Sequence, residues 1–171
     1  MVDLDKLQTM WREDAKLDDI ELGKEALNVA SLHAKYITIL STAKLNLRKE
    51  QSDYAKLRRY KWRYYRGELN QYELKDLGWE QWQGAKPLKN EMDEQLEGDF
   101  DLIKKKDKVA YWETIVSFLE YVMRSINSRG WDIKNAIEWH KFTKGQMLSF
   151  PLHYSIRKLM PFDCILNIPT S

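Results

Sequence analysis

The chain has 171 residues, a formal net charge of +2 and a single cysteine, Cys164. This length suffices for one domain with a sizeable core, while a lone cysteine excludes an intrachain disulfide framework and argues against a thiolate metal cluster. The amino terminus lacks the basic and apolar regions of a secretory signal, and no apolar run approaches the ~20 residues that a membrane span needs. We therefore expect an intracellular protein of a reducing cytosol, without a membrane partner.

Acidic residues gather in two segments. The first 25 residues hold eight acids against four cations, and residues 91–101 hold six acids and no cation. Such segregation predicts a bipolar molecule whose acidic parts contact a basic partner or a neighbouring subunit. For the amino-terminal arm taken alone, dispersed solubilising charge is the slightly better explanation.

Residues 26–47 have the apolar spacing of a long amphipathic helix. Apolar side chains recur every three or four positions, at Val29, Leu32, Tyr36, Leu40, Ala43 and Leu47. Neither Gly nor Pro occurs between Gly23 and Gly67, so the pattern predicts one long helix, or two abutting helices, ending near Arg66. Gly67 is expected to provide the C-cap.

The end of this helix is the most informative part of the chain. Residues 56–66, KLRRYKWRYYR, contain six cations and four aromatic residues with no acid between them. The cations are Lys56, Arg58, Arg59, Lys61, Arg63 and Arg66, and the aromatic residues are Tyr60, Trp62, Tyr64 and Tyr65. Because cations neutralise phosphates and flat rings stack on any exposed base, the combination favours single-stranded nucleic acid.

Helical spacing arranges several of these cations into a ridge. The stripe consists of Lys56, Arg59, Arg63 and Arg66, and Arg48 and Ser52 extend it backwards. The aromatic residues fall on several sides of the helix, so some of them must belong to the core. A solvated basic face above aromatic core residues is the alternative, but purely solubilising faces usually mix both charge signs.

Residues 67–100 are expected to connect the helices without forming a core element. Four glycines and Pro87 interrupt this segment, which predicts a series of short turns. Trp79 and Trp82 are interpreted as anchors that hold the segment against the helices. Stacking on bases is the alternative, which is less favoured because buried tryptophan is common and the local charge is near neutral.

The most regular apolar period of the chain lies in residues 109–126. Steps of three and four alternate through Val109, Trp112, Val116, Leu119, Met123 and Ile126, as in a coiled-coil heptad. Gly130 and the two residues before it are expected to break this helix. Residues 131–142 then resume as a second amphipathic helix with Ile133, Ile137, Trp139 and Phe142. A DNA-reading helix-turn-helix would need polar residues there, so self-association is the better interpretation.

Patterns of catalytic chemistry are absent from the sequence. No GxxxxGK(S/T) phosphate loop occurs. His33, His140 and His153 are isolated from one another, and Glu138 and His140, two positions apart, fall on different helix faces and cannot chelate a metal alone. The acids of residues 91–101 match a nuclease carboxylate cluster only in number. We therefore expect no catalytic residue, no metal, no cofactor and no enzymatic activity.

Several motifs together resemble the UvsY recombination mediator family of T-even-like bacteriophages. They are LDKLQTMWREDAKLD near the start, YKWRYYRG at residues 60–67, YWETIVSFLEYVMRSINSRGWDIKNAIEW at residues 111–139, and HKFTKG at residues 140–145. The resemblance implies an all-α long-helix bundle with a carboxy-terminal helix-turn-helix assembly region, forming ring-like homo-oligomers of six or seven subunits. It also implies a non-enzymatic protein that binds single-stranded DNA in the cytoplasm of the infected host. Its implied role is to load a phage recombinase onto strands coated by the phage single-strand-binding protein, in recombination, repair and recombination-dependent replication.

The resemblance also suggests how the chain is divided. Residues 1–145 correspond to the mediator domain, with amino-terminal helices in 1–66, an irregular connector in 67–100 and self-assembly helices in 101–145. The heptad residues with Ile133 and Ile137 fall in the assembly region. The tail, residues 146–171, has no counterpart in the family pattern.

Two basic positions of the family motif are tied to DNA binding, and they fall on Arg59 and Lys61. Here the bulky Tyr60 and Trp62 stand beside them, which departs from the family pattern and leaves open how the helix lies over DNA. Two alternatives remain beside the mediator. One is a helical structural or regulatory protein whose basic helix binds duplex nucleic acid or an acidic partner, and the other is a carboxylate-dependent nuclease.

Overall fold

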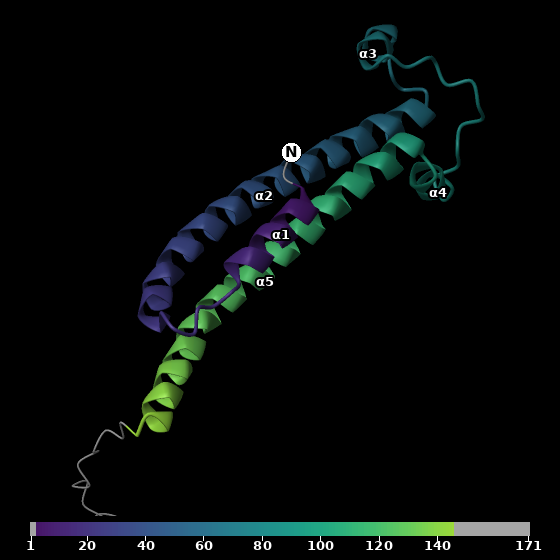
Figure 1. Cartoon of the computed structure of the whole chain (residues 1–171). Helices are drawn as coiled ribbons and strands as arrows, with labels where there is room; N and C mark the ends of the chain where they lie inside the picture. Colours follow the sequence, from purple (N-terminus) through teal and green to yellow (C-terminus); the bar gives the residue numbers. More distant parts are fainter. Residues whose placement is uncertain (1–2, 146–171) are drawn as a thin grey trace, which may run out of the picture.

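The computed structural model describes residues 3–145, and this part of the chain is all helical. Its elements are α1 (Leu4–Asp14), α2 (Leu22–Tyr65), α3 (Gln71–Leu77), α4 (Met92–Glu97) and α5 (Phe100–Thr143). The two long helices, α2 and α5, run antiparallel as a curved hairpin, and α1 lies along them (Figure 1). The expected all-α class of long helices is therefore confirmed. The tail, residues 146–171, lies outside the described residues.

Helix α2 forms as the apolar spacing predicts. Leu32, Tyr36, Leu40 and Ala43 are buried, and the stripe packs into the main core. The helix is unbroken over 44 residues and ends at Tyr65, with Arg66 as the C-cap and Gly67 after it at a left-handed φ of 68°. There the Gly67 N–H donates to the Tyr64 carbonyl and the Glu68 N–H to the Arg63 carbonyl, each at 2.9 Å. This pair of bonds satisfies the last carbonyls of the helix, as in a Schellman motif.

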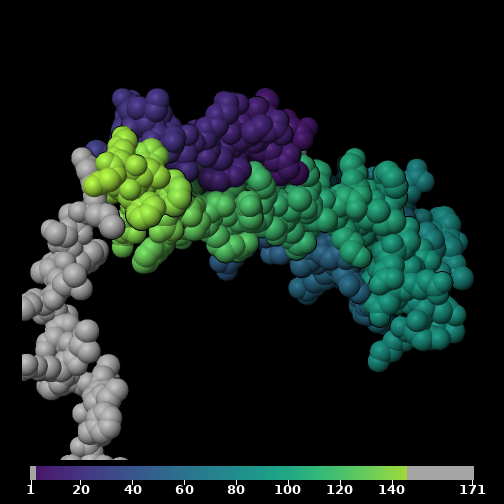
Figure 2. Space-filling model, turned by 60° about the horizontal axis from the view of Figure 1, so that its bottom comes forward, coloured from purple at the N-terminus to yellow at the C-terminus, as the bar shows by residue number. Residues whose placement is uncertain are grey.

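The heptad residues of α5 pack inside a single chain. Trp112, Val116, Leu119, Met123 and Ile126 are buried, and they share one core with the apolar stripe of α2 and with Leu7 of α1. In Figure 2 the amino-terminal segment, in purple, covers part of α5, in green. The assignment of this seam to contacts between subunits is therefore corrected. An antiparallel hairpin gives α5 a matching apolar partner in α2, which a sequence period alone does not distinguish from a second copy.

Gly130 does not break α5, which continues as one helix from Phe100 to Thr143. The expected helix-turn-helix is therefore wrong. Glycine costs about 1 kcal/mol in a helix interior, an amount that the packing of its neighbours can outweigh. Ile126 and Ile133, on either side, are almost completely buried.

Arg129, next to the glycine, binds the end of α1. Its guanidinium donates to the carbonyls of Asp14, Ala15 and Lys16 at 2.7–3.2 Å and pairs with Glu25 at 2.8 Å. Carbonyls at the end of a helix otherwise lack partners. Arg129 therefore fixes both the short helix and the loop to α2 at this point of α5.

The connector is more ordered than expected and contributes to a second small core. Met92 and Leu96 of α4 are buried against Tyr65 and Leu102. Helix α3 begins with a capping box at Asn70, and it lies at the tip of the hairpin in Figure 1. The expectation that residues 67–100 form no core element is therefore wrong for α4.

Trp82 packs against the second core, as predicted for an anchor. Its ring meets that of Tyr65 edge-on, with centroids 4.9 Å apart. Trp79 meets Tyr64 in the same manner at 5.2 Å. Both tryptophans therefore hold the connector to the end of α2.

Helix α5 extends past the start of α2, so its last turns project from the hairpin (Figure 1). Large apolar side chains are exposed on α5 after Gly130, notably Trp131, Trp139 and Phe142, at 61–67%. Within residues 3–145 no helix combines the length and apolar character needed to cross a membrane.

Candidate nucleic-acid interface

Lys56 and Arg59 form the accessible centre of the predicted ridge. Both side chains are exposed on α2, and neither makes an ion pair with any residue that the structure describes. Arg48, which was predicted to extend the ridge, is also exposed and without a carboxylate partner in residues 3–145. Its neighbour Lys49, which the sequence analysis did not single out, has the same character. These four cations are available to phosphates without breaking any existing bond.

Three further cations of the segment make surface ion pairs. Arg58 pairs with Asp93 at 2.7 Å, and Arg66 pairs with Glu68 at 2.8 Å. Arg63 donates both guanidinium ends to Glu73, at 2.8 and 3.0 Å, and these bonds raise its pKa. Ion pairs at the surface are weak because water screens them, so exchanging a carboxylate for a phosphate costs little.

Lys61 is buried, with only 7% of its surface exposed. Its Nζ lies 3.0 Å from Asp99 Oδ2 and 2.6 Å from Asp101 Oδ2. Tyr65 donates its hydroxyl to Asp99 at 2.6 Å, and the ring of Trp79 lies 4.5 Å from the Lys61 ammonium. The ammonium that the resemblance assigned to DNA is therefore enclosed within the protomer, where it joins the ends of α2 and α5.

The protonation of this buried group follows from its contacts. Burial lowers the pKa of Lys61, but hydrogen bonds to Asp101 and Asp99 outweigh burial, so the pKa is raised overall. Burial likewise raises the pKa of Asp99, and the bonds from Tyr65 and Lys61 outweigh it, so that pKa is lowered. Both residues are therefore charged near neutral pH, as an ion pair requires.

The acidic segment 91–101 serves the chain's own basic segment. Asp93 pairs with Arg58, and Asp99 and Asp101 pair with Lys61. The hairpin brings these residues together, although about 35–40 positions separate them. The prediction that this acidic run meets a partner protein is therefore wrong for these three aspartates. The opposite charges of residues 56–66 and 91–101 were the signal in the sequence from which these ion pairs could have been predicted.

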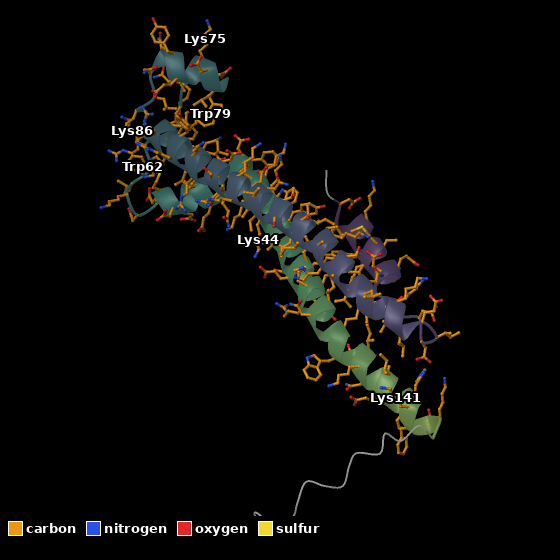
Figure 3. The ribbon with its side chains drawn as sticks, turned by 90° about the vertical axis from the view of Figure 1, so that its left-hand side faces the viewer. Lys44, Trp62, Lys75, Trp79, Lys86 and Lys141 are labelled. Atoms are coloured by element: carbon orange, nitrogen blue, oxygen red, sulfur yellow. The ribbon has the colours of Figure 1, made fainter. Side chains whose placement is uncertain are left out.

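The aromatic residues of the segment divide between surface and core. Tyr60 and Trp62 remain 39% and 38% exposed, whereas Tyr65 is buried and Tyr64 is partly buried. Figure 3 shows Trp62 close to Lys86 at the end of α2, with Trp79 on the other side of the helix. The prediction that some of these rings belong to the core is confirmed. Tyr60 and Trp62 are the rings that a base can reach.

The residues predicted for assembly are mostly inside the protomer. Ile133 is 2% exposed, Val109 and Ile137 are partly buried, and the other heptad residues lie in the main core. A separate aromatic set is exposed near the end of α5 and consists of Trp131, Trp139 and Phe142, while Phe100 and Tyr121 are exposed nearer the start of this helix. The Trp139 and Phe142 rings stack at 5.9 Å. Trp139 and Phe142 were predicted to share an amphipathic helix with Ile133 and Ile137, and the apolar period alone does not separate the exposed rings from the packed isoleucines.

Comparisons with known proteins agree with the resemblance. The family described as "Recombination, repair and ssDNA binding protein UvsY" matches residues 10–146. The recombination protein uvsY of Enterobacteria phage T4 is 25% identical over 143 residues, which make up 84% of this chain and 98% of that relative.

Solved structures share the fold. Two crystal structures of the bacteriophage T4 recombination mediator protein UvsY match with TM-scores of 0.74 and 0.72, at 24% and 23% identity. The matches cover 85% and 81% of this chain and 100% and 98% of those chains. The long hairpin described above is therefore an architecture that this chain has in common with those proteins.

Proposed function

Because the chain belongs to the UvsY family of recombination, repair and single-stranded-DNA-binding proteins, we propose that it is a recombination mediator. In this role it binds single strands and loads a phage recombinase onto strands coated by the phage single-strand-binding protein. It acts by binding rather than by catalysis, in the cytoplasm of the infected host, and it serves recombination, repair and recombination-dependent replication.

The observation that carries this proposal is the exposed face of α2. Lys56 and Arg59 are accessible and without carboxylate partners in the described chain, and the exposed rings of Tyr60 and Trp62 stand beside them. Cations that track a backbone, next to rings that stack on bases, are the usual means of binding single strands without sequence preference. Lys61 supports this face from inside the protomer and is not part of the proposed contact.

We assign self-association to the aromatic set at the end of α5. Trp131, Trp139 and Phe142 are 61–67% exposed near the end of α5, so the chain's own helices leave most of their surface uncovered. A second copy presents the same surface, as closed homo-oligomers require. Several copies on one strand raise the effective concentration of each basic face, so weak individual contacts add up.

The proposed mechanism is a competition over strand geometry. Strands held on several basic faces of one oligomer are bent, and a bent strand is a poorer ligand for the single-strand-binding protein. The recombinase then nucleates on the exposed strand. Asp5 of the amino-terminal arm is exposed and makes no ion pair within residues 3–145, so it remains available for partner proteins.

Salt-dependent binding tests the DNA-binding face. Fluorescence anisotropy of a labelled single strand, over a salt series and with competing duplex, gives affinity and salt slope. Each phosphate contact contributes about −0.7 to the slope for single strands, so Lys56→Ala with Arg59→Ala should weaken binding and flatten the slope by about 1.4. The charge-matched control is Lys6→Ala with Lys75→Ala, two exposed lysines away from this face.

Two outcomes would contradict the assignment. Equal affinity and slope in a folded Lys56/Arg59 double variant would remove this face from DNA binding. Displacement by duplex at equal concentration would favour the alternative, a helical protein that binds duplex nucleic acid. For the mediator role, the readout is the lag in recombinase ATP hydrolysis on coated strands, which wild type should shorten and the double variant should not.

A further inference from the structure

A pocket of about 580 Å³ opens at the tip of the hairpin, where the connector returns along the end of α2. Its lining comes from both segments and consists of Trp62, Arg66, Gly67, Glu68, Lys86, Pro87, Leu88, Lys89 and Met92. Ligand sites in proteins have volumes of roughly 300–1,000 Å³, so the space suits a small group such as one nucleotide.

One wall of the pocket is a flat cationic stack. The Arg66 guanidinium lies 4.4 Å from the centre of the Trp62 ring, which keeps 38% of its surface exposed. Arg66 Nε also pairs with Glu68 Oε1 at 2.8 Å. This bond orients the guanidinium and neutralises the one carboxylate of the lining, so the wall can accept another flat π system without a repelling charge.

Two lysines stand on the opposite, connector side. Lys86 and Lys89 are exposed, and neither makes an ion pair within residues 3–145. Lys86 crosses close to Gly67, where a Cβ would lie 3.5 Å from its Cε. Pro87 fixes its own φ and favours an extended backbone at Lys86, which restricts the backbone from which the Lys86 side chain projects. Figure 3 shows Lys86 close to Trp62, and Lys89 lines the same pocket.

We propose that this pocket is a subsite for one nucleotide of a single strand, with its base stacked on the Trp62–Arg66 wall. Lys86 and Lys89 contact the phosphates on either side of that nucleotide. The proposal rests on the proposed function and names where a base, rather than only the backbone, is held. Stacking uses the face that every base has, so the subsite discriminates against duplex, whose bases are already stacked, and not between sequences.

The pocket continues the basic face of α2. Trp62 follows Arg59 by three residues, so the two side chains are neighbours on the helix surface. A strand that lies on Lys56 and Arg59 can therefore reach the pocket without crossing to another side of the hairpin. The connector lysines, which neither composition nor helical period singled out, become the far end of one continuous path.

A fluorescent base tests the subsite directly. The probe is an oligo(dT) strand with one 2-aminopurine, whose emission is quenched when the base stacks on a ring. Wild type should quench it, Trp62→Ala should remove the quenching and weaken binding roughly tenfold, and Trp62→Phe should restore part of both. Lys86→Ala with Lys89→Ala should flatten the salt slope by about 1.4, while the Lys6/Lys75 control should not.

The outcomes separate this proposal from the proposed function. Quenching that is unchanged in a Trp62→Ala variant of native helicity would overturn the subsite while leaving strand binding intact. If wild type bound no single strand at all, the proposed function itself would be wrong. Full displacement of the strand by free deoxyadenosine monophosphate at equal concentration would also overturn the proposal, since it would identify a mononucleotide pocket.

Discussion

At the scale of single residues, the basic segment contains two kinds of cation that the sequence presents alike. Arg59 is exposed on the outer face of α2, whereas Lys61, two positions on, is enclosed by Asp99, Asp101 and the Trp79 ring. Successive residues of a helix point about 100° apart, so two positions suffice to turn a side chain from solvent to core. Substituting Arg59 should therefore affect DNA binding, whereas substituting Lys61 should affect the stability of the protomer.

Alanine substitution separates the two roles by stability. Lys61→Ala leaves Asp99 buried without its cation, which should lower the free energy of unfolding by about 3 kcal/mol. Arg59→Ala removes an exposed, unpaired side chain and should change it by less than about 0.5 kcal/mol. Urea unfolding followed by circular dichroism measures both. A Lys61→Ala protein as stable as wild type would contradict the structural role assigned to this ion pair.

Asp99 should make stability depend on acid. Folding lowers the pKa of Asp99 below its unfolded value of about 3.9. The charged side chain therefore stabilises the fold at pH values above the unfolded pKa. This stabilisation is lost as the pH falls through the lowered pKa of the folded state. Asp99→Asn keeps an N-cap residue at α5 but removes the charge. The stability gap between wild type and Asp99→Asn should therefore be largest near pH 7 and shrink below about pH 4.

Unfolding in urea over a pH series checks this dependence. Glu97→Gln is the matched control, because Glu97 is exposed and makes no ion pair within the described residues. Its difference from wild type should be small at every pH. A gap for Asp99→Asn that stayed constant from pH 7 to pH 3 would show that the Asp99 charge is not what stabilises this end of the hairpin.

At the scale of elements, α5 is the helix whose continuity matters most. It carries the core seam on one side and the exposed aromatic set on another, and Gly130 lies between them in sequence. If α5 is unbroken, the two surfaces have a fixed angular relation. A turn at Gly130 would let them move independently and would detach the proposed assembly surface from the hairpin.

Gly130→Ala tests the continuity of α5. A Cβ at this position would meet no atom within 4 Å, and the helical backbone there suits alanine. The substitution should therefore raise the free energy of unfolding by about 0.5–1 kcal/mol. Gly67→Ala is the contrasting control, since its φ of 68° strains any side chain and should destabilise. Thermal unfolding that showed destabilisation by Gly130→Ala would favour a turn at this position.

At the scale of the whole molecule, α5 has two apolar surfaces with different roles: the buried seam stabilises the protomer, and the exposed aromatic set is the proposed assembly surface. Leu119 is fully buried in the protomer, whereas Trp131 is 67% exposed near the end of α5. A buried, unpaired charge is costly, so Leu119→Asp should unfold the chain. A substitution to Asp at the exposed Trp131 should leave the fold intact and remove only apolar surface that a second copy would cover.

Trp131→Asp with Trp139→Asp should therefore give smaller particles of native helicity. Light scattering measures the mass and circular dichroism the fold. Binding of long single strands should weaken as well, since each basic face loses its neighbours, while the salt slope per protomer stays the same. Leu27→Asp with Leu45→Asp, at two exposed positions of α2, is the charge-matched control. A tryptophan double variant that kept its wild-type mass would remove this aromatic set from assembly.

The sequence by itself determined the all-helical class, the extent of α2, the cation-rich surface and the anchoring tryptophans. These features depend on neighbours three or four positions apart, which helical geometry relates directly. Only the tertiary structure decided which partner each surface meets. It assigned the heptad seam to α2 rather than to another copy, enclosed Lys61 between Asp99 and Asp101, and brought Lys86 beside Trp62. The physical reason is that these contacts join residues far apart in the chain, and local spacing contains no information about the chain reversal that brings them together.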